Sequence, residues 1–218
     1  MSAVVSRVST ILSLADSRLP TGGHVHSGGV EEAVARGLVR DIATVEAFLN
    51  RRLRTTGAVT ASVAAAVCES VVDVAIAELE TDARTPSPAA RAASRAQGRG
   101  LLRLARASWP DEAWDSLPRR PHLAVIAGVV GRVAGLTGLD LASVQIYTTM
   151  TGSAIAAQRL LALDPSEIAA CTLRLARTCD EVADVVYSSL PTLIDLSDPL
   201  LDVLAESHVQ RERPLFVS

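Results

Sequence analysis

Two histidines and a glutamate near the start of the chain have side chains that could hold a metal ion. His24 and His26 lie in a glycine-rich turn, and Glu31 heads the apolar stretch that follows. Neutral imidazole is the commonest protein metal ligand, so a metal-dependent helical enzyme built on these residues is one hypothesis. Side chains at i and i+2 of an extended turn point apart, however, and no carboxylate or cysteine within two residues completes a ligand set. The other hypothesis is that the histidines cap the turn or contact a partner protein.

The remaining catalytic chemistries lack the residues they need. All 21 basic residues other than histidine are arginine, which excludes a P-loop NTPase site and a Schiff-base or pyridoxal-phosphate site. No Gly-x-Ser-x-Gly elbow is present, and Cys68, Cys171 and Cys179 form no Cys-x-x-Cys pair. We interpret these cysteines as buried free thiols. His122 begins an apolar stretch, and we interpret it as a cap or a packed imidazole rather than a catalyst.

Four arginines form a positive stripe along one helix face. Arg91, Arg95, Arg99 and Arg103 recur at i+4 spacing. The stripe is either a solvated face or a docking site for an acidic partner. A helical transcription regulator is the third class of function considered, but the net charge of −3 and the absence of a basic recognition helix argue against nucleic-acid binding. Gln97, Gly98 and Gly100 lower the helix propensity here, which predicts the close approach of another backbone.

Helical periodicity recurs along the chain, whereas alternating strand patterns are nearly absent. Hydrophobic residues make up 49% and aromatic residues 3% of the sequence, which predicts a core of Ala, Val and Leu. We expect one compact all-α multi-helix bundle over residues 1–218, with a partly flexible C-terminal tail over 190–218. Thr81–Pro88 is the clearest break. The predicted helices are Val5–Ala15, Gly28–Gly37, one capped by Asp41, Gly57–Leu79, Ala89–Ala107, His122–Leu136, Asp140–Leu163 and one from Asp164, with Pro165 in its first turn, to Ser188.

The uncharged run 141–158 is too polar for a membrane span, because it contains Gln, Ser, Tyr and three Thr. The first residues lack the clean apolar stretch of a signal peptide. The sequence therefore predicts a cytoplasmic protein that binds neither membrane nor nucleic acid.

Three segments resemble the UreF family of urease accessory proteins. Residues 17–31, Ser-Arg-Leu-Pro-Thr-Gly-Gly-His-Val-His-Ser-Gly-Gly-Val-Glu, are similar to the specific turn motif of the family. Residues 93–102, Ala-Ser-Arg-Ala-Gln-Gly-Arg-Gly-Leu-Leu, look like its Arg-x-x-Gly-x-x-Leu-Leu stretch. The C-terminus, from His208 to Leu-Phe-Val-Ser, resembles the closing motif. The resemblance is spread over the whole chain.

The resemblance implies a non-catalytic helical homodimer that links the UreD/UreH protein and the UreG GTPase to apo-urease. It also implies that nickel is the transferred cargo of that complex rather than a stably bound cofactor of this chain. Because a tail that orders on a partner needs few apolar anchors, Leu215 and Phe216 are the expected ones. The partner-binding residues that follow from the three motifs are Leu19, Pro20, Gly22, Gly23, His24, His26, Ser27, Glu31, Arg95, Gln97, Gly98, His208, Leu215 and Phe216.

Overall fold

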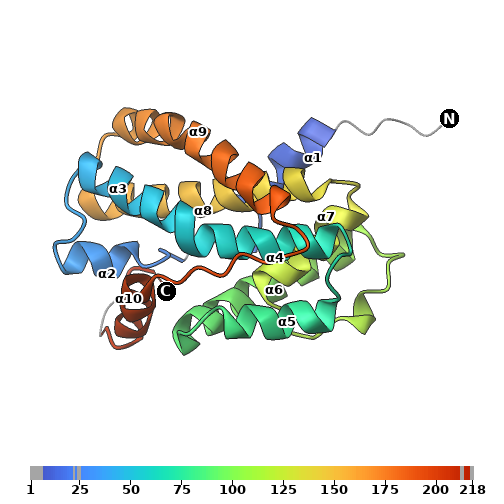
Figure 1. Ribbon diagram of the computed structural model, residues 1–218. Helices are drawn as coiled ribbons and strands as arrows, with labels where there is room; N and C mark the ends of the chain where they lie inside the picture. The colour runs from blue at the N-terminus through green and yellow to red at the C-terminus, as the bar shows by residue number, and fades with distance from the viewer. Residues whose placement is uncertain (1–6, 22, 24–25, 212–213, 217–218) are drawn as a thin grey trace.

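Helices make up the regular structure of the chain in the computed structural model, which describes residues 7–21, 23, 26–211 and 214–216 (Figure 1). No β-strand occurs in these residues, which confirms the all-α prediction. The α-helices are α1 (Arg7–Leu14), α2 (Val30–Ala35), α3 (Ile42–Arg52), α4 (Ala58–Cys68), α5 (Val74–Ala83), α6 (Pro88–Ser108), α7 (Leu123–Val133), α8 (Gly138–Leu161), α9 (Pro165–Ser188) and α10 (Pro199–Val209). A π-helical turn, η2 (Leu53–Gly57), joins α3 to α4, and a 3-10 turn, η3 (Trp114–Ser116), precedes α7.

Local capping signals place several helix starts where the sequence predicts them. The Asp41 side chain accepts a hydrogen bond from a backbone N–H of the first turn of α3 at 2.9 Å. The Asp164 side chain does the same for α9 at 2.6 Å, with Pro165 at the first helical position. Ser87 and Pro88 start α6 in the same way, one residue before the predicted start at Ala89. These contacts span two or three residues, so the sequence alone is enough to predict them.

The prediction of one helix over Gly57–Leu79 is wrong, because α4 ends at Cys68 and α5 begins at Val74. Ser70 adopts a positive φ of 59°, which ends the helix. Arg132 of α7 then binds the Val67 carbonyl at 3.1 Å and the Ser70 hydroxyl at 2.9 Å. The following helix continues to Ala83, so only residues 84–87 of the expected break at 81–88 are non-helical before α6.

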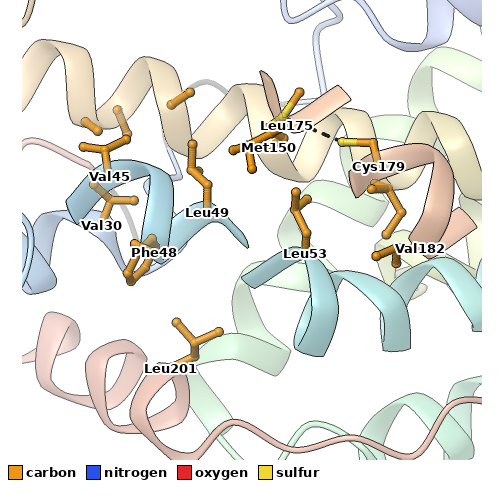
Figure 2. Close-up of a cluster of buried hydrophobic side chains, with 14 of the residues drawn as sticks. Val30, Val45, Phe48, Leu49, Leu53, Met150, Leu175, Cys179, Val182 and Leu201 are labelled. Carbon is orange, nitrogen blue, oxygen red and sulfur yellow. Dashed lines mark hydrogen bonds between the residues drawn. The ribbon is translucent and has the colours of Figure 1, made fainter. Parts of the chain in front are cut away.

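Two buried clusters form the core, and α4 lies between them. The first joins α2, α3, α8, α9 and α10, and Figure 2 shows Leu49 and Leu53 beside Met150 of α8 and Val182 of α9. The second joins α4, α6 and α7. Helix α4 presents mainly alanines and valines to both α7 and α8, which lets the helices approach closely. All three cysteines are buried and free, as predicted.

The segment 190–216 contains a packed helix. Helix α10 lies beside α2 and α6 and buries Leu201, Leu204 and His208 (Figure 1). Asp198 caps α10 and forms a two-pronged ion pair with Arg51 of α3, with N–O distances of 2.5 and 2.6 Å. The C-terminal segment therefore closes over the first core cluster.

Candidate partner-binding surface

The carboxylate of Glu31 joins the glycine-rich turn to the end of the chain. Gly28 and Gly29 have φ values of +63° and +90°, which Gly adopts readily, and α2 begins directly after them. Glu31 is 3% exposed, and its two oxygens accept backbone N–H groups from Leu215 at 2.7 Å and Phe216 at 3.1 Å. Hydrogen bonds to an ionised acceptor are roughly twice as strong as neutral ones.

His208 contacts the carbonyl group of the same segment. Its Nε2 lies 3.2 Å from the Phe216 carbonyl oxygen, which can only accept, so Nε2 carries the proton. Its Nδ1 lies 3.7 Å from the carboxylate of Glu31. The side chain of Phe216 is buried, whereas the neighbouring Leu215 is 78% exposed. We call Glu31, His208 and the residue 215–216 backbone the tail clamp.

Glu32 ties α2 to α10 beside the tail clamp. Its carboxylate accepts from Arg36 at 2.8 Å and from Arg211 at 3.0 Å. The hydrogen bond from Arg36 lowers the pKa of Glu32, and Arg211 adds to this effect. Arg36 also donates to the Ser207 hydroxyl at 2.7 Å. Sequence reasoning missed Arg36 and Arg211. The i+4 spacing of Glu32 and Arg36 was the available signal, but nothing local indicates Arg211.

Two glycines of α6 allow backbone segments to lie against the helix, as the sequence predicts. A Cβ on Gly98 would lie 2.1 Å from the Pro121 carbonyl oxygen. One on Gly100 would lie 2.6 Å from the carbonyl oxygen of Thr21, which belongs to the glycine-rich turn. Gly23 of the same turn lies beside Gln97 of α6, since a Cβ built on Gly23 would be at an ordinary contact distance of 3.8 Å from Oε1 of Gln97. The first two motifs therefore meet along α6.

The other turn residues occupy different environments. Leu19 and His26 are half-buried and Pro20 is exposed, while Gly22 and His24 lie outside the described residues. Ser27 is buried, and its side-chain oxygen lies 3.4 Å from the backbone N of Glu31. The described partner-binding residues of the first motif thus lie in this turn and in the start of α2. The tail clamp joins the residues of the third motif to them through Glu31.

The arginine stripe is divided into a paired half and an exposed half. Arg95 binds Glu78 at 2.7 Å and Asp82 at 2.9 Å, both on α5, and also the Arg120 carbonyl at 2.9 Å. Arg91 donates to backbone carbonyls of the α5–α6 connection. Arg99 and Arg103 are exposed, and neither forms an ion pair with any residue that the structure describes. Only this second half is presented to solvent.

His122 is a packed imidazole that locks α5, α6 and α7 together. Its Nε2 lies 2.9 Å from an oxygen of Asp82, and its Nδ1 lies 3.0 Å from the Ser94 hydroxyl. The sequence of contacts from Asp82 through His122 to Ser94 resembles the catalytic triad of a hydrolase. The imidazole is completely buried, however, and the Ser94 hydroxyl also accepts the backbone N–H of Leu123 at 3.2 Å. The arrangement therefore serves to hold three helices together.

This histidine makes stability depend on pH. Burial lowers the pKa of His122 below its ordinary value of 6.5, outweighing the hydrogen bond to Asp82 that raises it. Because the folded protein then binds the proton less readily than the unfolded chain, the neutral imidazole of His122 favours the folded state fully above pH 6.5. The free energy of unfolding falls as the pH drops below that value. Below pH 6.5 we expect His122 to lower the free energy of unfolding by up to about 1.4 kcal/mol per pH unit. Urea unfolding of the wild type and of His122→Asn at pH 7.0, 6.0 and 5.5 measures this dependence. If the free energy of unfolding falls equally with pH in both proteins, His122 is not its cause.

The metal hypothesis receives no support from the described residues. Within them, no group of three or more His, Cys, Asp or Glu side chains is placed to hold a metal ion. Both oxygens of Glu31 already accept backbone N–H groups in the tail clamp. Across the same part of the chain, no helix is both long enough and apolar enough to span a membrane.

Comparison with known proteins identifies the family. The UreF family model matches residues 39–176. The chain is 62% identical to the urease accessory protein UreF of Mycolicibacterium vanbaalenii over 217 residues, which cover 98% of this chain and 100% of that protein. It is 59% identical to UreF of Mycobacterium bovis and 58% identical to UreF of Mycobacterium tuberculosis, each over 214 residues with the same coverage. The chain therefore belongs to the UreF family, whose members are urease accessory proteins and not enzymes.

Proposed function

We propose that this chain is a scaffold of urease maturation that links the UreD/UreH protein and the UreG GTPase to apo-urease. In this role it works in the cytoplasm as a homodimer, and nickel passes through the assembled complex as cargo. It presents shaped surfaces to other proteins and supplies no reacting group of its own.

The arrangement of the three motif segments supports this proposal. They lie far apart in the sequence, yet Thr21 lies against Gly100 of α6 and Glu31 holds the backbone of Leu215 and Phe216. A turn shaped by glycines and a clamped tail make a surface of defined form, which suits protein recognition.

Leu215 is the single observation that carries the proposal furthest. The clamp holds its backbone while its side chain is 78% exposed, so an apolar group stands in solvent at a fixed position. A few well-packed side chains supply most of the binding free energy of protein interfaces, and an apolar side chain held at a fixed position is suited to be one of them. Phe216, by contrast, is buried in the first core cluster of the chain and so holds the neighbouring Leu215 in place.

Leu215→Ala should weaken recovery of the UreD/UreH protein about five- to thirty-fold when the chain is purified from cells that express the urease operon. Loss of a central apolar anchor costs about 1–2 kcal/mol of binding free energy, which corresponds to this factor. Quantitative co-purification with mass spectrometry measures it.

Leu173→Ala is the matched control, because Leu173 is 75% exposed on α9 and no predicted partner-binding residue lies on that helix. Both variants should keep wild-type helicity by circular dichroism. Equal recovery of the partner by the Leu215 and Leu173 variants would show that the tail is not the anchor.

A further inference from the structure

Arg52 is a guanidinium without a counter-ion beside the glycine-rich turn. It ends α3, and its Nη1 donates to the Gly28 carbonyl at 2.7 Å. Its Nε is buried without a hydrogen-bond partner, and no carboxylate in the described part of the chain pairs with it. The adjacent Arg51, in contrast, binds Asp198 through two bonds. Burial lowers the pKa of Arg52 to about 10, and no neighbouring charge offsets this.

The π-helical turn η2 follows Arg52 directly. Such turns insert one extra residue into a helix and occur frequently at functional sites. Thr56, within this turn, has a buried hydroxyl that also lacks a hydrogen-bond partner. Buried polar atoms are nearly always hydrogen-bonded, so two unpaired ones four residues apart need an explanation.

Arg52 and Thr56 line the same cavity, which has a volume of about 590 Å³. Volumes of this size are typical of small-molecule sites. The lining is mainly apolar, but hydroxyl and amide groups are contributed by Thr60 of α4 and by Gln145, Thr148, Thr149 and Ser153 of α8. These neutral groups can donate hydrogen bonds but cannot neutralise the guanidinium.

The carboxylates that line this cavity are engaged elsewhere. Asp16 pairs with Arg18 at 2.6 Å, and Asp198 pairs with Arg51. Asp202 accepts the backbone N–H of Ser87 at 3.3 Å. Among the described residues, no carboxylate that lines the cavity is therefore free to balance Arg52.

We propose that Arg52 and Thr56 bind a small, singly charged planar oxyanion of the carboxylate or carbonate class as a free ion. The guanidinium offers N–H groups in a planar fork that matches two oxygens of such an ion. The Thr56 hydroxyl donates to the same ion. Among the described arginines that line the cavity, Arg52 is the one whose Nε is buried without a partner. A single buried guanidinium matches a single negative charge, and this favours a monoanion over a phosphate dianion.

Titration of ¹⁵N-labelled full-length protein with sodium formate tests the proposal. The readout is the side-chain Nε–Hε resonance of Arg52, assigned by its loss in Arg52→Lys. We expect a saturable shift with a dissociation constant in the millimolar range, which is the ceiling for a ligand of three heavy atoms. A separate titration with bicarbonate shows which of the two ions the site prefers, by comparison of its dissociation constant with that of formate. Sodium chloride at equal ionic strength should give no saturable shift.

Thr56→Val keeps the side-chain shape and leaves Arg52 in place, so it carries the test even if Arg52→Lys does not fold. We expect it to weaken formate binding about ten-fold, since a single hydrogen bond to a charged group is lost. Arg99→Gln, which removes an exposed arginine elsewhere, should bind like wild type. Equal binding by Thr56→Val, or a saturable shift with chloride as large as with formate, overturns the site. The experiment uses the purified chain without partners, so its outcome is independent of the scaffold proposal.

Discussion

Gly98→Ala should destabilise the protein by about 2–3 kcal/mol, although alanine is the better helix former. The new Cβ would lie 2.1 Å from the Pro121 carbonyl oxygen, which is backbone and cannot rotate away. Helix α6 would have to move away from the segment that leads into α7, and the lock between His122 and Ser94 would be strained. Urea unfolding followed by circular dichroism measures the change.

Gly152→Ala is the matched control for this substitution. Gly152 also lies inside a long helix, α8, but no atom lies within 4 Å of a Cβ built there. We expect it to stabilise the protein by about 0.5–1 kcal/mol, because alanine restricts the unfolded chain. If both variants unfold at the same urea concentration, the close approach of residues 121–122 to α6 is wrong.

Glu31→Gln should free residues 214–216 from α2. An amide has one oxygen acceptor in place of two, so a backbone N–H of the tail clamp loses its partner and faces an NH₂ group instead. A lost charge-assisted bond together with an unpaired buried N–H costs about 2–4 kcal/mol. Hydrogen exchange at the Phe216 amide should become at least ten-fold faster, and recovery of the UreD/UreH protein should fall as it does for Leu215→Ala.

Glu167→Gln removes one charge from an exposed first-turn position of α9 and should change stability by no more than about 0.5 kcal/mol. It separates the loss of the tail clamp from a general effect of net charge. Unchanged protection of the Phe216 amide in Glu31→Gln would falsify the clamp.

Some expectations from the sequence depended on interactions that only the fold creates. The i+4 spacing of Arg91, Arg95, Arg99 and Arg103 places the four on one helix face. It does not reveal that Arg95 faces the acids of α5 while Arg99 and Arg103 face solvent. The Gly98 and Gly100 pair correctly predicted a close backbone approach, because small residues inside a helix are a local mark of it. Which backbone approaches was not predictable.

The sequence by itself determined the helical class, the start of α3, α6 and α9, and the family. Caps, prolines and apolar periodicity act over a few residues, so their effects can be read locally. Only the tertiary structure decided where α4 ends, since Arg132 of α7 caps it, and which partners Glu31 and Arg52 have. Glu31 and Phe216 are 185 residues apart. A contact of that length depends on the packing of all the helices between them, and no local pattern encodes it.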